Sequence, residues 1–313
     1  MSLELRRPGR DLALGLALAA LAAAPRPTRA AACCVSATSF GVGRLLAWED
    51  AAGGLQLTHA RSLGQWDSGG SLRWNPPDYS DGLTTAQLWG ILRVQEHVQL
   101  QGWAPVVVND RQSGGRSQVA GGLGDVGAGA RLEVLKIGEY QGLPSLAFTV
   151  SGLAPTGRRP EQTRPPLFAG TTGRGAWGGS LALELEYAFL PWFVRLDGGA
   201  TGYLPFRRGD TGVSQRYGPS LQVALSTGRE LVADVLVAAV ALTGEWEAAS
   251  VSAGRTVPGS AARQYGVAGS LSWRFDPRWT VTASVVNNVW PGGAGQNRDA
   301  RVGFTLGVRR GHF

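Results

Sequence analysis

The stretch GGLGDVGAGARLEVL, residues 121–135, decides the fold. Its glycines have the G-x-G-x-x-G spacing of a dinucleotide-binding loop, which needs an apolar strand before it and a helix after it. Here a polar turn over residues 109–118 comes first, and apolar side chains then follow at every second position from Val126 to Val134. A period of two is typical of a β-strand and not of a helix. The glycines therefore lie in a strand, and we expect no nucleotide site.

The same two-residue alternation recurs along the chain, and no convincing amphipathic helix follows residue 35. In Leu181 to Phe189, for example, apolar side chains alternate with Ala and Glu. Strands are expected near residues 41–48, 53–61, 85–103, 118–136, 143–154, 178–190, 192–204, 215–227, 230–245, 263–275, 278–288 and 299–310. This is about twelve strands (roughly 10–14), and bacterial single-chain barrels have an even number. The sequence thus predicts an all-β fold with a single antiparallel β-barrel.

A targeting signal begins the chain. Arg6, Arg7 and Arg10 precede an apolar run over residues 12–24, and residues 30–32 have the A-x-A form of a cleavage site. This is the layout of a secretory signal peptide, and the run is too short to span a membrane. We therefore expect residues 1–32 to be removed on export and residues 33–313 to form the barrel. Since no later apolar run approaches the length of a spanning helix, residence in a membrane requires a closed barrel.

Two cysteines, Cys33 and Cys34, follow the expected cleavage site directly. One hypothesis is lipidation of Cys33 at the mature N-terminus. The other is an unpaired or intermolecularly paired thiol, because adjacent cysteines form a strained bridge. The 30 basic and 23 acidic residues are interspersed along the chain. Nucleic-acid binding needs clustered basic residues, so we expect no nucleic-acid partner.

The second face of the strands favours a transmembrane barrel over a soluble sandwich. It carries Gly, Ala, Ser and Thr with few charges, which suits a lumen, and many Trp residues lie near strand ends, as in interfacial aromatic belts. Long loops fall near residues 62–84, 155–176, 205–214 and 247–262 and are expected on the extracellular side.

The last residue, Phe313, is the terminal aromatic that outer-membrane barrels commonly present for assembly, although it is out of phase with the even-numbered apolar residues of the last strand. We expect export to the outer membrane of a Gram-negative bacterium. The expected partners are outer-membrane lipid, lipopolysaccharide, the barrel-assembly machinery and a small-molecule solute.

Charged residues on the polar phase of neighbouring strands are the candidate lumen lining. These candidates are His97, Asp125, Arg131, Glu133, Glu184, Glu186, Arg195 and Asp197. His97 is in phase with Gln95 and Gln99, and its pairing with Asp125 on the neighbouring strand is one hypothesis. A lining of mixed sign would set the selectivity of a pore, whereas the same residues joined in salt bridges would close a narrow barrel. Both interpretations stay open.

No catalytic motif accompanies these residues. The chain has 3 His, no G-x-S-x-G motif, and no cluster of His, Cys and Asp at metal-ligand spacing. We therefore expect no enzymatic activity, no cofactor and no metal.

Short Gly-rich motifs in a fixed order carry a family resemblance. They are, in chain order, Gly122, Gly124 and Asp125; then Pro155, Thr156 and Gly157; then the segments 171–175 and 184–187. This order resembles the outer-membrane barrels of the meta-pathway phenol degradation type, which look like distant relatives of the long-chain fatty acid transporters. The resemblance covers roughly residues 85–313. It implies a channel for small solutes, hydrophobic or aromatic ones among them.

By analogy with the fatty acid transporters, a plug would precede the barrel, but residues 33–60 are short and strand-like, so the sequence predicts strands there. Two functions of different class follow. One is passive transport of small solutes through the lumen. The other is a non-conducting structural or surface-interaction barrel whose lumen is salt-bridged and whose long loops contact partners.

Overall fold

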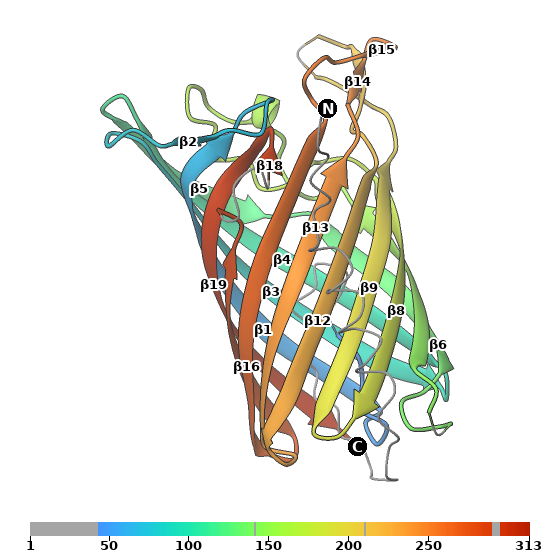
Figure 1. Cartoon of the computed structure of the whole chain (residues 1–313). Coiled ribbons are helices and arrows are strands. Elements are labelled where there is room, and N and C mark those ends of the chain that lie inside the picture. Colours follow the sequence, from blue (N-terminus) through green and yellow to red (C-terminus); the bar gives the residue numbers. More distant parts are fainter. Residues whose placement is uncertain (1–42, 141, 210, 290–294) are drawn as a thin grey trace, which may run out of the picture.

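The computed structural model describes residues 43–140, 142–209, 211–289 and 295–313, and they form a closed antiparallel barrel (Figure 1). The wall strands are β1 (Ala51–Trp66), β3 (Ser80–Gln95), β4 (Val98–Ser113), β6 (Val126–Leu135), β7 (Ser145–Ala154), β8 (Gly178–Phe189), β9 (Trp192–Tyr203), β12 (Ser220–Val232), β13 (Leu236–Glu247), β16 (Ala262–Asp276), β17 (Trp279–Asn287) and β19 (Arg298–His312). Each strand pairs with the next in this order, and β19 pairs back with β1. Among the described residues the wall therefore has the twelve strands that the sequence predicts.

Short strands extend the wall at one end. β2 (Leu72–Trp74) pairs with β1, β5 (Arg116–Leu123) with β4, and β18 (Gly295–Gln296) with β16. A separate small sheet stands beyond the barrel, and β14 and β15 are seen above the rim in Figure 1. It consists of β10 (Phe206–Arg207), β11 (Ser214–Arg216), β14 (Val251–Ser252) and β15 (Arg255–Thr256). A single 3₁₀ turn, η1 (Pro160–Gln162), is the helical structure among the described residues.

The two ends of the barrel differ in the length of their connections. Two-residue turns at 96–97, 190–191 and 277–278 lie at the end where the chain terminates, marked C in Figure 1. Long connections, such as the one from β7 to β8, lie at the opposite end. Outer-membrane barrels place short turns in the periplasm and long loops outside the cell, which orients this barrel with its C-terminus at the periplasmic end.

The strand count agrees with the prediction, but two errors in the boundaries cancel. Residues 43–48, expected within a strand, have no strand structure, and residues 41–42 lie outside the described residues. The expected strand 85–103 is two strands joined by a turn at Glu96 and His97. The turn escapes notice because Val94 and Val98 keep the same apolar phase on either side and no Gly or Pro marks it.

The irregular segment expected over residues 62–84 is also shorter in the structure. β1 continues to Trp66, β3 already begins at Ser80, and β2 lies between them. The polar end of β1 pairs with β19, where Gln65 faces Asp299. Backbone pairing continues here past the point where the apolar alternation stops, so the hydrophobic pattern alone ends the strand too early.

The wall has an apolar outer face and a polar inner face. On β6 the outward Leu132 and Val134 are exposed, whereas the inward Arg131 and Glu133 are buried. The predicted strand 118–136 is wrong as one element, because β5 ends at Leu123 and β6 begins at Val126. The predicted turn over residues 109–118 is also too long, since β4 continues to Ser113 and β5 begins at Arg116. Within β6 the alternation from Val126 to Val134 is the division between outside and lumen. This arrangement is inside-out relative to a soluble protein and matches a barrel in lipid. No helix in the part of the chain that the structure describes has the length and apolar character to cross a membrane.

A charge placed on the outer face tests this orientation. Leu57 on β1 is 47% exposed and lies between Leu306 and Ala86 on the neighbouring strands. We expect Leu57→Arg to lower the free energy of unfolding in phospholipid vesicles by about 2–4 kcal/mol, because the guanidinium must enter hydrocarbon. Gln65→Arg, outward at the rim of the same strand, is the control and should have little effect. Equal urea midpoints for the two variants would contradict a lipid-facing Leu57.

Candidate functional site: the barrel lumen

Buried charges occupy one side of the lumen, at its periplasmic end. Six of the candidate lining residues are each less than 10% exposed: Arg131 and Glu133 on β6, Glu184 and Glu186 on β8, and Arg195 and Asp197 on β9. They come together because the odd positions of β6 and β9 and the even positions of β8 point inward. Charged groups this deeply buried require partners, since an isolated buried charge is costly.

Glu184 is the centre of this cluster. The Arg131 guanidinium donates to both of its carboxylate oxygens, at 2.9 and 2.7 Å, and Arg195 Nη2 donates to Oε2 at 2.7 Å. Arg195 also binds Asp197 at 2.8 Å. Bidentate arginine–carboxylate pairs are the strong form of the ion pair and fix the geometry of both partners. The cluster therefore holds β6, β8 and β9 in place as well as lining the lumen.

A short segment before β1 enters the barrel. Arg44 and Leu45 are 7% and 3% exposed; Arg44 Nη2 donates to Glu186 at 3.0 Å, and the Leu45 amide donates to Gln99 Oε1 at 3.4 Å. Glu49, fully buried, pairs with Arg309 on β19 and caps the turn by accepting from the Leu46 amide. We call residues 43–49 the inserted segment. The prediction of a strand without a plug at this position is wrong for these residues, because their contacts are with lumen side chains.

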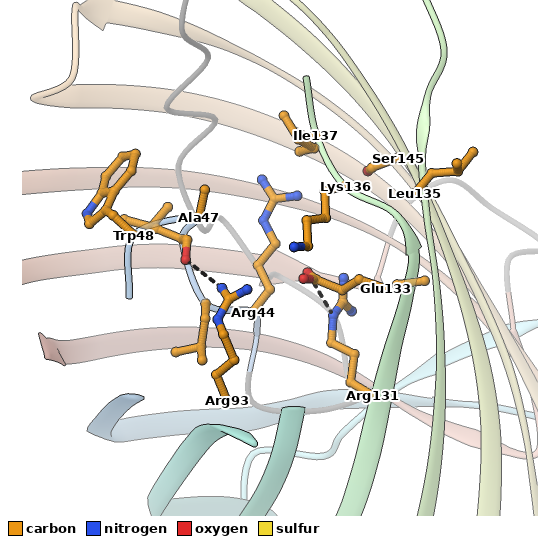
Figure 2. Close-up of a pocket in the computed structure, with 13 residues that line it drawn as sticks. Arg44, Ala47, Trp48, Arg93, Arg131, Glu133, Leu135, Lys136, Ile137 and Ser145 are labelled. Atoms are coloured by element: carbon orange, nitrogen blue, oxygen red, sulfur yellow. Dashed lines mark hydrogen bonds and ion pairs between the residues drawn. The ribbon is translucent and has the colours of Figure 1, made fainter. Parts of the chain in front are cut away.

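A small cavity lies beside the inserted segment. A cavity of about 60 Å³ lies between this segment and β6, and its lining includes Arg44, Arg93 and Glu133. Figure 2 shows Arg44 extending between Arg93 on β3 and the Arg131–Glu133 pair on β6. Arg44 and its ion pair with Glu186 therefore narrow the lumen at this level.

The hypothesis that His97 pairs with Asp125 is wrong in the described contacts. His97 lies in the β3–β4 turn, where its Nδ1 is 2.8 Å from the carbonyl oxygen of Glu133. It is therefore at the periplasmic rim and not in the middle of the lumen. In the same turn Glu96 pairs with Lys136, and this hydrogen bond lowers the pKa of the Glu96 carboxyl.

Asp125 organises the long connection between β7 and β8. Its Oδ1 accepts from the Gly157 amide at 2.9 Å, and its Oδ2 accepts from the amides of Arg174 and Gly175 at 2.7 and 3.2 Å. Thr156 adds a second link, since its hydroxyl donates to the Gly124 carbonyl at 2.5 Å. Gly157 leaves no room for a side chain, because a Cβ there would lie 2.7 Å from the Cα of Gly173.

The Gly-rich motifs thus meet in space as one loop anchor. Thr172 completes it: its hydroxyl donates to the carbonyl of Leu123 and accepts from the amide of Arg158. The side chain of Arg158 also reaches the carbonyl of Gly121, across the space above Gly122. The residues of the first three of these motifs therefore hold this loop against the wall, whereas segment 184–187 contributes Glu184 and Glu186 to the lumen cluster.

A second charged cluster, at the extracellular end, could not be identified from the sequence. Arg174 pairs with Glu247 at 2.6 Å, and Arg298 bridges Glu247 and Glu245. The guanidinium of Arg174 lies 4.9 and 5.1 Å from the ring centroids of two tyrosines, Tyr203 and Tyr217. Burial alone would lower the pKa of Arg174, but the hydrogen bond to Glu247 and its charge raise it. Arg174 therefore stays charged.

Residues expected to act outside the barrel wall are placed as follows. Residues 1–32, Cys33 and Cys34 lie outside the described residues. Phe313 follows the end of β19, is 54% exposed, and lies 5.8 Å from the Arg278 guanidinium. Among the described residues no group of three or more His, Cys, Asp and Glu is arranged to hold a metal ion.

Solved structures share this architecture. The chain is similar to the COG4313 outer membrane channel from Pseudomonas putida F1, with a TM-score of 0.70 and 15% identity over 88% of this chain and 99% of that one. It is also similar to the beta domain of the Bordetella autotransporter BrkA, with a TM-score of 0.51 and 13% identity over 83% and 99%. No curated protein matched the sequence.

The closed wall, its apolar exterior and its charged interior define an outer-membrane β-barrel. The particular family follows from the sequence: residues 78–297, more than half of the chain, match the family described as "Putative MetA-pathway of phenol degradation". The chain belongs to this family, as the resemblance stated above implies.

Removing the Asp125 carboxylate tests the loop anchor. We expect Asp125→Ala to free the connection over residues 155–177 at a local cost of about 1–3 kcal/mol, because backbone amides lose a charged acceptor. Faster hydrogen exchange at Gly157 and Arg174 in the folded barrel would report the release. Asp110→Ala removes an exposed carboxylate on β4 and should leave the exchange unchanged. Identical exchange in the two variants would rule out Asp125 as the anchor.

Neutralising Glu184 tests the lumen cluster. Glu184→Gln leaves Arg131 and Arg195 buried with less compensation, so we expect the free energy of unfolding to fall by about 3–5 kcal/mol. Urea unfolding of the vesicle-embedded barrel measures this loss. Glu96→Gln is the matched control, because the exposed pair with Lys136 contributes little to stability. A Glu184→Gln barrel as stable as the control would mean that the cluster is hydrated and not structural.

Proposed function

We propose that this barrel is an outer-membrane channel for small aromatic solutes. The observation that carries the proposal is the inward orientation of polar and small side chains along a closed wall whose outer face is apolar. Such a wall provides a hydrated path across lipid. Family membership supports the aromatic substrate class, because the family is described by phenol degradation. The COG4313 relative is itself described as a channel, although a likeness at 15% identity speaks for the fold alone.

The wall opposite the charged cluster supports passage of a neutral solute. There the inward side chains include hydroxyls that bond to one another and small residues, and the inward Arg301 and Arg309 of β19 are paired with Asp81 and Glu49. Thr58 bonds to Thr305 at 3.0 Å, and Ser272 bonds to Thr282 at 2.7 Å. A wall of paired hydroxyls presents no net charge, so it discriminates little against a neutral aromatic molecule.

The alternative is a non-conducting structural barrel. The observation that favours it is the inserted segment in the periplasmic half, where Arg44 pairs with Glu186 inside the lumen beside a cavity of about 60 Å³. The ion pairs that line a pore also fill a narrow one. The two functions differ in whether the inserted segment leaves the lumen.

We further propose that the candidate lining residues line this path: Arg131, Glu133, Glu184, Glu186, Arg195 and Asp197. Residues 1–32 act as the signal peptide for export, and Cys33 is the residue at which lipidation would occur. Phe313 is offered to the barrel-assembly machinery, and lipopolysaccharide surrounds the extracellular rim. A non-enzymatic role is part of this proposal, because the chain carries no G-x-S-x-G motif.

Conductance separates the channel from the closed barrel. We expect the refolded, heat-modifiable protein to show small, infrequent openings in a planar bilayer. Arg44→Ala combined with Glu49→Gln should raise the mean conductance, because the inserted segment loses its pairs with Glu186 and Arg309. Arg61→Ala, which removes an exposed side chain from the outer face of β1, should match the wild type.

The opposite result would favour the structural barrel. A folded protein that stays silent even when the inserted segment has lost both pairs would contradict the channel. Swelling of vesicles in a phenol gradient then separates ion conduction from solute passage.

A further inference from the structure

One row of residues crosses four strands of the wall at a single level. Its members, each the direct cross-strand partner of the next, are Gly54 on β1, Trp89 on β3, Trp103 on β4 and Gly127 on β6. Both tryptophans lie at inward positions, because the alternation on β3 and β4 points odd residues into the lumen. Two indoles are therefore side by side inside the barrel, flanked on each side by a glycine.

The glycines let the indoles lie against the wall. A Cβ at Gly127 would be 2.1 Å from Cζ2 of Trp103, and one at Gly54 would be 2.7 Å from Cζ2 of Trp89. Each ring thus occupies the space that a neighbouring side chain would fill. Neither indole is fully buried. Part of their aromatic surface is consequently left uncovered inside the lumen, which is costly unless another apolar group covers it.

Hydrogen-bond donors without partners lie on the periplasmic side of this row. Gln99 and Gln101 are the two inward residues of β4 between the periplasmic end and Trp103, and they are 0% and 7% exposed. The Nε2 atom of each is nevertheless buried without an acceptor. Arg131, the direct cross-strand partner of Gln99, has its Nε 3.7 Å from a carboxylate oxygen of Glu133, so it is ion-paired. Buried donors are normally satisfied, so the two unsatisfied glutamine amides on β4 point to an acceptor that binds there.

The inserted segment now covers this region. Leu45 forms a buried cluster with Ala52 and Ile91, and both tryptophans pack against that cluster. The backbone amide of Leu45 donates to Gln99 Oε1. The inserted segment thus uses the acceptor of the Gln99 side chain and leaves its Nε2 donor without a partner. Leu45 thus belongs to the apolar cluster against which the indoles pack, and an aromatic ring on the indole faces would compete with this cluster.

We propose that Trp89, Trp103, Gln99 and Gln101 form a binding site for a single aromatic ring bearing an oxygen acceptor, such as a phenol. The ring packs on the indole faces and displaces Leu45, and its oxygen accepts hydrogen bonds from the two glutamine amides. The donors are neutral amides beside an arginine already paired with Glu184, so the site suits an uncharged oxygen better than a free carboxylate. This proposal rests on the channel function, and it names the solute and its place in the lumen.

Paired probes test the site directly. We would measure ¹⁹F line broadening of 4-fluorophenol and 4-fluorotoluene with the detergent-solubilised barrel. Gln99→Leu with Gln101→Leu should weaken 4-fluorophenol binding by about tenfold, the loss expected for one or two hydrogen bonds, and leave 4-fluorotoluene unchanged. Trp103→Leu should weaken both probes, and Leu45→Ala should strengthen both. Gln112→Leu, exposed on the outer face of β4, is the control.

Two results would overturn the site. One is equal weakening of both probes by the glutamine double variant, and the other is unchanged binding in Trp103→Leu. Heat-modifiable migration confirms that each variant is folded, and Trp89→Phe, which keeps a ring, should retain most of the binding. Phenol permeation with unchanged probe binding in the variants would reject the site and keep the channel. Probe binding without permeation would reject the channel and keep the site.

Discussion

Closure of the wall by β1 and β19 is the constraint on which the rest of the structure depends. The two strands pair from Ala51 with His312 to Trp66 with Arg298, so the start and the end of the barrel sequence satisfy each other's backbone groups. In lipid no water can bond to these backbone groups, so the N–H and C=O groups of an open edge strand would stay unpaired. Once the wall is closed, alternate side chains of each strand face lipid or lumen. A charged side chain in the spanning part of a strand must therefore point into the lumen.

That division explains why the lumen holds a network of ion pairs. Glu184 is buried with Arg131 and Arg195. Burial removes water from these charges, and the attraction within each ion pair offsets that desolvation cost. A barrel of this width places facing walls within reach of long side chains. Arg44 therefore reaches Glu186 from the inserted segment, and the occlusion of the periplasmic half follows from the number of strands as much as from any one residue.

The sequence predicts what depends on local periodicity. The inward and outward faces of β6 and the loop between β7 and β8 follow from alternation and from Gly and Pro, whereas the strand count agrees only because two boundary errors cancel. The turn at His97 is not marked, because two residues of turn preserve the phase of the flanking valines. The inserted segment is missed for a different reason: residues 41–48 are predicted as a strand, and only the long-range contacts of Leu45 with Gln99 and of Glu49 with Arg309 place the segment inside the barrel. Likewise, the Gly-rich motif identifies a family but not the anchor that Asp125 builds with the amides of a loop distant in sequence.

Occlusion and recognition involve the same surface in this lumen. Bulky residues could close a barrel by filling it, but Gly54 and Gly127 instead let two indoles lie against the wall and leave part of their faces uncovered. The cover comes from a segment that has no strand pairing of its own and is held by a few side-chain contacts. A solute with a flat ring and one oxygen offers those same surfaces a better complement than Leu45, because it also satisfies the free amides of Gln99 and Gln101. The same tryptophans and glutamines then serve to close the lumen in the absence of solute and to select the solute when it is present.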